Sequence, residues 1–142
     1  MKTKSLGYYK KKTWKAFSDY IRTRDCLLTT RTLERCRCVT CRKEFSYSEI
    51  QAGHAIGGRN NSILFDEELV NGQCKGCNGF GNGKYAEYSV WFIKKYGIKE
   101  WEEKVELSKQ VVQYKKSDYM GIYEKYRDEL DLLLKDYYKL LT

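Results

Sequence analysis

The sequence contains no proline, a single histidine and no long apolar run. The absence of proline, combined with frequent charged residues, favours long helices over a loop-rich fold built of strands. No apolar stretch approaches the ~20 residues that a membrane span requires, so we expect no membrane insertion. The N-terminus is basic but lacks the apolar segment of a secretory signal, which predicts a cytoplasmic location where thiols stay reduced. At 142 residues, the length fits one domain with an appended helical region.

Positive charge is concentrated at one end of the chain. Residues 1–45 carry 13 Lys and Arg against 4 Asp and Glu, whereas residues 98–142 carry 9 against 10. Such an end predicts a polyanionic partner, nucleic acid or an anionic membrane, although a solubilising surface explains a charge run equally simply. Tyr8, Tyr9 and Trp14 lie among the lysines, and because aromatic rings stack on bases they favour nucleic acid. The residues that we expect to contact nucleic acid are Lys10, Lys11, Lys12, Lys15, Arg22, Arg24 and Arg59.

Six cysteines in a reducing compartment indicate metal ligands and spare thiols instead of a disulfide framework. Two CxxC pairs separated by 32 residues are typical of one tetrahedral Zn²⁺ site. The ligands predicted by this spacing are Cys38, Cys41, Cys74 and Cys77. Cys36 is a rival to Cys38 at a looser spacing, and Cys26 is expected to pack as a small apolar residue. Four thiolates close the coordination sphere, so this zinc is structural and any chemistry must come from other residues.

The only histidine, His54, lies between the two cysteine pairs, and Asn78 directly follows the last cysteine. Hydrolysis of a phosphodiester needs a base near neutral pH, which suits an imidazole, and a divalent cation to offset the phosphate charge. The amide oxygen of Asn78 can bind such a cation. We expect Asn78 at the start of a helix, opposite a strand that carries His54, in a ββα-metal arrangement. A lone histidine is ordinarily only a satisfied polar residue, and it is this context that favours catalysis.

Hydrophobic periodicity predicts an α+β fold that is mainly helical. The predicted elements are a flexible basic arm over 1–12, a helix capped by Thr13 over 13–25, an irregular segment over 26–37, a helical turn over 46–49, a strand over 51–56, a second strand between 63 and 70, a tight reversal at 71–72, and helices over about 84–96, 99–113 and 117–140. The zinc-stapled core with its first helix spans 13–97, and a helical region spans 98–142. The apolar stripe of the last helix predicts intramolecular packing, with a dimer seam as the alternative.

Together, CVTC, GH and CKGCN resemble the zinc-stapled His-Me finger (HNH) nucleases, a group that includes phage endonuclease VII. In that group a histidine on the first strand acts as the base, and an asparagine after the last CxxC binds the catalytic metal. Further segments resemble the phage NinG (Rap) recombination proteins over most of the chain from about Lys15. These segments are KAFSDYIRTRDC, AGH, GQCKGCN, GNGKYAEYSVWFIKKYG and IYEKYRDEL.

The resemblance implies a metal-dependent, structure-specific DNA endonuclease in the bacterial host cell, which cuts branched recombination intermediates such as D-loops and Holliday junctions. It implies His54 as the general base, Asn78 as a ligand of catalytic Mg²⁺ or Mn²⁺, and the four cysteines as ligands of structural Zn²⁺. Paired cuts at a junction favour a homodimer. Two alternatives stay open. One is a non-catalytic, zinc-containing DNA-binding module, and the other is an interaction protein that uses its tyrosine-rich C-terminal helices.

Three positions depart from the HNH pattern. The residue before the base, an Asp or His metal ligand in many HNH sites, is Gly53 here. The central Asn of the pattern falls on Leu69, and Asn78 stands where many relatives have His. The second protein ligand of the catalytic metal is therefore open. Its candidates are Asp66, Glu67, Glu68, Glu49 and Gln51.

Overall fold

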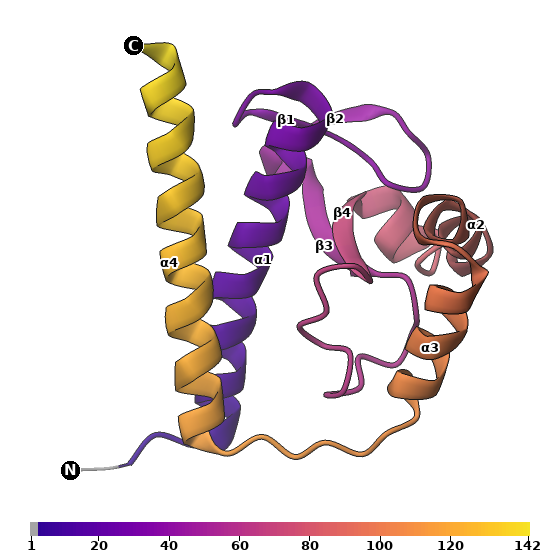
Figure 1. Ribbon diagram of the computed structural model, residues 1–142, viewed down its shortest axis with the longest axis vertical. Coiled ribbons are helices and arrows are strands. Elements are labelled where there is room, and N and C mark those ends of the chain that lie inside the picture. The colour runs from indigo at the N-terminus through magenta and orange to yellow at the C-terminus, as the bar shows by residue number, and fades with distance from the viewer. Residues whose placement is uncertain (1–2) are drawn as a thin grey trace.

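The computed structural model describes residues 3–142, and over that range helices predominate beside two separate two-stranded sheets (Figure 1). The elements are α1 (Leu6–Thr30), β1 (Arg35–Arg37), β2 (Glu44–Ser46), a 3₁₀ turn η1 (Tyr47–Glu49), β3 (Ile50–His54), β4 (Val70–Cys74), a π-helical turn η2 (Gly76–Phe80), α2 (Tyr85–Tyr96), α3 (Ile98–Ser108) and α4 (Lys116–Leu141). The predicted mixture of many helices with short strands is confirmed. No helix in the described part of the chain is long and apolar enough to cross a bilayer.

The first helix is longer at both ends than predicted. Ser5, not Thr13, caps it, because the Ser5 hydroxyl accepts a hydrogen bond from the first turn. Thr13 instead lies within the helix, where its buried hydroxyl donates to the carbonyl oxygen of Tyr119 (3.0 Å). The expected arm over 1–12 is thus helical from Leu6 onward, and its residues 1–2 lie outside the described part of the chain. Packing against α4 stabilises the lysine-rich first turns of α1. The pattern of apolar residues alone does not predict that the helix begins there.

The predicted irregular segment over 26–37 is more regular than expected. Its first five residues complete α1, and its last three form β1. β1 pairs antiparallel with β2, and the turn between them carries the first CxxC pair. This small sheet escaped the sequence analysis because three-residue strands have too little alternation to detect.

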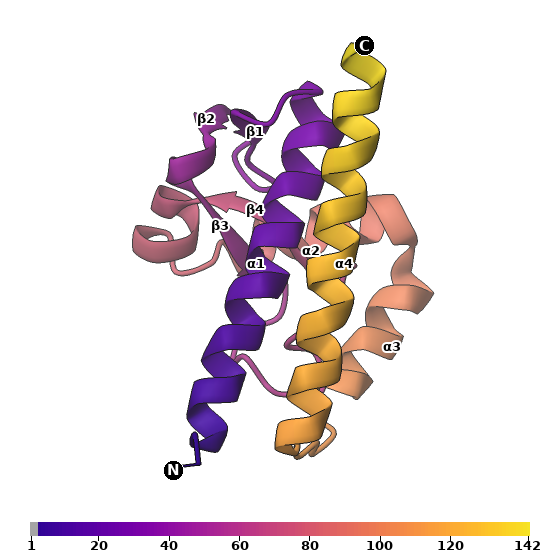
Figure 2. The ribbon, with the colours of Figure 1, turned by 90° about the vertical axis from the view of Figure 1, so that its left-hand side faces the viewer.

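α1 lies between α4 on one side and the β3–β4 hairpin on the other (Figures 1 and 2). α1 and α4 run parallel, and Phe17 meets the edge of Tyr126 with ring centroids 4.7 Å apart. On the opposite side of α1, Ala52 and Val70 join the same buried cluster. The apolar stripe of α4 therefore packs within the chain along its first half, as predicted, while Leu140 near its end is exposed.

β3 pairs antiparallel with β4, so that Gln51 lies opposite Gln73 and Gly53 lies opposite Asn71. The predicted tight reversal at 71–72 is wrong, because both residues continue β4. A buried contact from α1 fixes this path, since a carboxylate oxygen of Asp25 accepts the backbone N–H at the centre of β4 (2.6 Å). Of the segment predicted as the second strand, between 63 and 70, only Val70 belongs to β4, and the rest is part of the long loop between β3 and β4.

Strand alternation gives this hairpin two faces with different neighbours. Ala52 and His54 lie on the face toward α1, where Ala52 packs beside Phe17. The opposite face carries Gln51, Gly53, Asn71 and Gln73, and α2 covers part of it through a tyrosine that bonds the Gly53 carbonyl oxygen (2.7 Å).

The remaining helices follow the predicted order with shifted ends. α2 ends at Gly97, whose φ of 94° suits glycine, as predicted. α3 stops at Ser108 instead of residue 113, and an extended segment crosses to the start of α4 (Figure 1). The N-cap of α4 is Lys115 instead of Ser117, because its backbone N–H donates to the side chain of Asp118 (2.8 Å).

Candidate metal centre and active site

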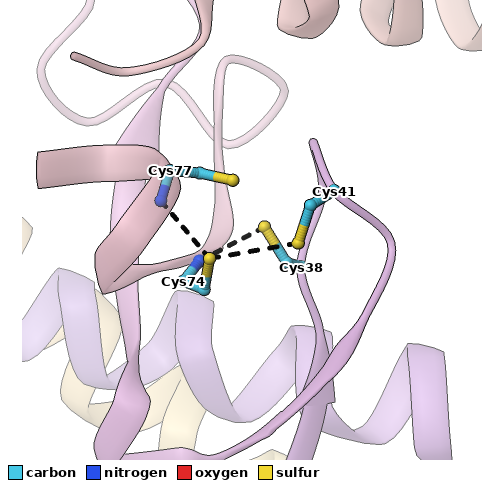
Figure 3. A group of neighbouring side chains, drawn as sticks. All are labelled: Cys38, Cys41, Cys74 and Cys77. Carbon is cyan, nitrogen blue, oxygen red and sulfur yellow. Dashed lines mark hydrogen bonds between the residues drawn. The ribbon is translucent and has the colours of Figure 1, made fainter. Parts of the chain in front are cut away.

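The four cysteines predicted as zinc ligands converge at one point (Figure 3). Their sulfur atoms all lie within 4.8 Å of one another, and those of Cys41 and Cys74 are 4.0 Å apart. Zn–S bonds of ~2.3 Å in a tetrahedron place the sulfur atoms about 3.8 Å apart. Cys38 and Cys41 lie in the turn after β1, Cys74 ends β4 and Cys77 lies in η2. These cysteines could therefore bind a structural metal such as zinc, which would join both sheets.

Hydrogen bonds within this cluster favour a thiolate at Cys38. Burial opposes the charge, but the backbone N–H of Cys74 (3.3 Å) and the hydroxyl of Thr40 (3.4 Å) donate to the Cys38 sulfur and lower its pKa to about 6. Burial raises the pKa of Cys74 to about 12, although the N–H of Cys77 donates to its sulfur. Four thiols this close need a cation among them to ionise together, so the donor set fits a divalent metal.

Cys36, the rival ligand, lies outside the group of four sulfur atoms. It is fully buried next to Cys26 and Ile50, and Cys26 packs as the apolar residue that the sequence predicts. The Cys36 thiol donates a hydrogen bond to the Cys26 sulfur, and this bond together with burial raises the pKa of Cys36 far above its usual range. The two spare cysteines are thus core residues beside the metal centre.

His54, the predicted base, is only 7% exposed at the end of β3. Its ring stacks on Trp14 of α1, with centroids 5.4 Å apart and planes inclined by 18°. Its Nε2 atom lies 3.2 Å from the carbonyl oxygen of Leu64. A carbonyl oxygen can only accept, so Nε2 carries the proton and Nδ1 keeps its lone pair. The contacts therefore select the tautomer that can take up a proton at Nδ1.

The surroundings of His54 also keep it uncharged. Burial lowers the pKa of His54 to about 4, and the charge of Arg59 acts in the same direction, while the Leu64 carbonyl and Asp66 oppose them. The guanidinium of Arg59 lies over the Trp14 ring at 4.3 Å from its centroid. Arg59 has a φ of 50°, in the left-handed region, which turns the loop toward α1. An exposed arginine thus stands beside a neutral imidazole at physiological pH.

Asn78, the predicted ligand of a second metal, lies on the other side of the hairpin. It follows Cys77 in η2, and its Nδ2 donates to Oε1 of Gln51 (2.8 Å). Because Gln51 and His54 project from opposite faces of β3, Asn78 and His54 approach the hairpin from different sides. Within residues 3–142, no hydrogen bond joins these two predicted site residues directly.

Among the five candidates for a further metal ligand, Gln51 is the one that contacts Asn78. Asp66 and Glu68 both pair with a lysine of α3, at 2.7 and 3.0 Å. Glu67 accepts hydrogen bonds from two tyrosine hydroxyls, at 3.2 and 3.1 Å. These three acidic residues therefore attach the long loop between β3 and β4 to the neighbouring helices.

Two buried amides on β4 were not predicted. The Nδ2 group of Asn71 donates to the Glu68 carbonyl and to the Tyr88 hydroxyl, both at 3.1 Å. The Nε2 group of Gln73 donates to the Gly83 carbonyl (2.9 Å) and to the hydroxyl of Thr40 (3.2 Å), which lies between Cys38 and Cys41 in the turn called the zinc knuckle below. The sequence analysis missed both amides because it predicted a reversal at 71–72. In an unbroken β4, strand alternation places them on the same face of the hairpin as Gln51.

The residues predicted to contact DNA differ in whether their charged groups are exposed or are paired with other residues of the fold. Lys10 and Lys15 lie on the first half of α1, where Lys10 contacts Asn61 (3.2 Å) and the exposed Lys15 pairs with Asp19 (2.8 Å). Lys12 lies over the Tyr123 ring, 4.6 Å from its centroid. Lys11 and Arg59 are exposed. These charges remain on the surface, and a polyanion can reach them.

Arg24 instead points into the fold, with its side chain 16% exposed. It pairs with Asp25 (2.8 Å) and donates to the carbonyl oxygens of Glu67 (2.8 Å) and Val70 (3.0 Å). Arg22 pairs within its own helix (2.7 Å) and reaches a carbonyl oxygen of β3 (3.4 Å). We therefore assign Arg24 a structural role that ties α1 to β4.

Comparison with known protein families gives a match over nearly the whole chain. The family model described as Bacteriophage Lambda NinG protein matches residues 1–136. No curated protein and no solved structure matches the chain significantly. The matched range includes the cysteine cluster, both faces of the β3–β4 hairpin and most of α4.

Proposed function

The chain belongs to the bacteriophage lambda NinG family, which implies a role in phage recombination, and from this premise we propose that it is a metal-dependent DNA endonuclease of the His-Me finger type. Its proposed substrates are branched recombination intermediates, D-loops and Holliday junctions. The observation that carries the proposal is the environment of His54. A neutral imidazole with its Nδ1 lone pair available stands beside an exposed arginine, on a hairpin that also holds Asn78 next to a zinc knuckle.

In the proposed reaction, Nδ1 of His54 removes a proton from the attacking water. The water oxygen bonds to phosphorus as the bond to the leaving oxygen breaks, and that oxygen takes a proton from solvent. The bond from Nε2 to the Leu64 carbonyl holds the reactive tautomer and becomes stronger once the ring is positive. Stacking on Trp14 fixes the plane of the ring. These contacts position the base before substrate arrives.

The phosphate is the natural partner of Arg59, whose planar guanidinium offers several donors. Its place over Trp14 brings that charge to the side of the hairpin where His54 lies. The exposed lysines on the first half of α1 extend the positive surface from this point, which suits a DNA backbone. Asn78 would hold Mg²⁺ or Mn²⁺ on the opposite face of the hairpin, where the cation would offset charge on the phosphate and the leaving oxygen of a DNA strand that crosses the end of β3 between the two faces.

The experiment is cleavage of a D-loop, a Holliday junction and a linear duplex in Mg²⁺ or Mn²⁺. We expect His54→Ala to lose activity by about 10²–10⁴-fold, the usual contribution of a general base. Tyr138→Ala, an exposed change near the end of α4, is the matched control and should retain activity. Circular dichroism and zinc content must agree among the three proteins. Cleavage that survives His54→Ala in folded protein would remove this residue from the mechanism.

A non-catalytic DNA-binding module is the second candidate. It is favoured by the position before the base, which is Gly53, and by the amide partner of Asn78, which is Gln51 instead of a carboxylate. This alternative predicts DNA binding that weakens steeply with salt, without cleavage in any divalent metal. Binding and cleavage assays on the same junction therefore separate the two functions.

A further inference from the structure

Gln73 has a buried acceptor without a partner. The residue is fully buried, and its Oε1 atom has no hydrogen-bond partner among the described residues. An unsatisfied buried acceptor loses the hydrogen bond that it makes to water in the unfolded chain, so such atoms are rare and call for an explanation. The amide orientation is well determined, because Nε2 faces the Gly83 carbonyl oxygen, which can only accept. The free atom is therefore the oxygen, a ligand atom for hard cations.

This oxygen lies where a side chain on Gly53 would project. A Cβ atom added to Gly53 would overlap Gln73 Oε1, and it would lie 3.0 and 3.1 Å from Cβ and Cδ of Gln73. Gln51 is the cross-strand partner of Gln73, and its own amide contacts Asn78. Gln51, Gln73 and Asn78 thus bring their carboxamides to the face of the hairpin that also carries Asn71. Gln73 fills the space beside Gly53, the residue before the proposed base.

We infer that Gln73 replaces the carboxylate missing at position 53 and is a protein ligand, with Asn78, of the divalent cation. This inference rests on the proposed function. The Nε2 bond to Thr40, whose hydroxyl contacts the sulfur of Cys38, anchors the amide to the zinc knuckle. The zinc centre would then position both protein ligands, since Asn78 follows the last zinc cysteine and Gln73 precedes the third.

A site made of amides has a distinctive consequence. A carboxylate supplies both a ligand atom and a negative charge, whereas an amide supplies only a dipole, and Mg²⁺ and Mn²⁺ favour charged oxygen ligands. The negative charge must then come from the phosphate of bound DNA. Metal and DNA should bind cooperatively, with each raising the affinity of the other by the same factor. The free protein should hold the cation weakly.

The test measures Mn²⁺ affinity by electron paramagnetic resonance on zinc-loaded protein, with and without junction DNA. A His54→Ala background keeps the DNA intact, and DNA alone gives the correction for Mn²⁺ on phosphates. We expect DNA to raise the affinity by about tenfold or more. Gln73→Glu should raise the affinity of the free protein by about tenfold and reduce the gain from DNA, because the carboxylate supplies the missing charge.

Asn71→Asp is the matched control, since it adds a carboxylate to the same strand and face but beside Arg24 (3.0 Å). It should leave Mn²⁺ affinity within about twofold, because this carboxylate lies away from the site. If Gln73→Glu fails to fold, Gly53→Asp combined with Gln73→Ser tests the same idea. The double variant restores a carboxylate and removes the Gln73 oxygen that a side chain at position 53 would overlap, so it should bind Mn²⁺ more tightly than Gly53→Asp alone.

The outcomes separate this inference from the proposed function. Folded Gln73→Glu with unchanged Mn²⁺ affinity, in a protein whose cleavage depends on His54, would overturn the role of Gln73 and leave the nuclease in place. A raised Mn²⁺ affinity in a protein that cuts no DNA would support the cation site and overturn the nuclease. A Mn²⁺ affinity that DNA leaves unchanged would contradict the amide site itself.

Discussion

The cysteine cluster and the β3–β4 hairpin are neighbouring regions, but different features of the sequence determine how their side chains come together. The cluster has one kind of side chain, at two closely spaced pairs, and its geometry suits Zn²⁺. The hairpin carries the proposed base on one face and amides on the other, and its geometry follows from strand register. One region is thus specified by residue type, and the other by position. Changes to the first should affect folding, whereas changes to the second should affect cleavage and cation binding.

The largest expected effect is that of removing zinc. Cys74→Ser, or a strong chelator, should destabilise the region that joins both sheets, because zinc binding contributes on the order of 10 kcal/mol to folding in small zinc domains. Thermal melting followed by circular dichroism, with released zinc measured by a chromogenic chelator, checks this. Cys26→Ala is the control, a buried cysteine outside the cluster, and should keep its zinc. Equal melting of holo and zinc-free protein would contradict a structural metal.

The next contrast is between Arg24 and Lys11, which the sequence places in one basic group. Arg24→Ala should destabilise the fold by about 3 kcal/mol, because it leaves the buried Asp25 carboxylate without its partner. Lys11→Ala should leave stability within about 0.5 kcal/mol and reduce the salt dependence of DNA binding by about one phosphate contact. Urea unfolding and DNA titrations at several salt concentrations measure the two effects. If Arg24→Ala instead weakened DNA binding and left stability unchanged, Arg24 would belong to the DNA-binding surface.

Acid pH should weaken the fold through His54. Its pKa of about 4 in the folded protein lies below the usual 6.5, so the unfolded chain binds the proton more readily. The stability that His54 contributes is complete above pH 6.5 and is lost as pH falls toward 4, by up to about 3 kcal/mol. His54→Gln should lack this part of the pH dependence. The difference between the two unfolding curves isolates it, because acid release of zinc affects both proteins.

Arg59 is expected to contribute little to stability and more to cleavage. Arg59→Ala removes an exposed side chain, so the free energy of unfolding should change by less than about 1 kcal/mol. Cleavage should nevertheless fall by about tenfold or more, because a phosphate contact beside the base is lost. Arg59→Lys should restore part of the activity, since charge returns without the planar fork. Activity equal to that of the unchanged protein would place Arg59 outside the site.

Residue type and spacing were enough to predict the convergence of the four cysteines, the strand that carries His54, and the end of α2 at Gly97. Each depends on local chemistry or on a short pattern. The path of β4 was mispredicted because Asn71–Gly72 favours a reversal in isolation, whereas Asp25 of α1 holds this segment extended. That tertiary contact joins residues 47 positions apart. No local pattern contains it.

The candidate site was predictable only in part for the same reason. His54 and Asn78 could be found from their places around the cysteines. Gln73 could not, because glutamine is an uncommon metal ligand and its relation to Gly53 arises from the register of β3 and β4. The stacking of Trp14 on His54 likewise depends on how α1 crosses the hairpin. The sequence thus identifies the proposed base, while the fold determines its tautomer and its charge.

The parallel pairing of α1 with α4 has a consequence for how the protein is made. The hydroxyl of Thr13 bonds a carbonyl oxygen 106 residues later, and the partner of Phe17, Tyr126, follows it by 109 residues. During synthesis from the N-terminus, the apolar side of α1 that α4 covers stays open until nearly the whole chain has left the ribosome. A nascent chain that stalls before Lys116 would present that uncovered side to chaperones and to other nascent chains.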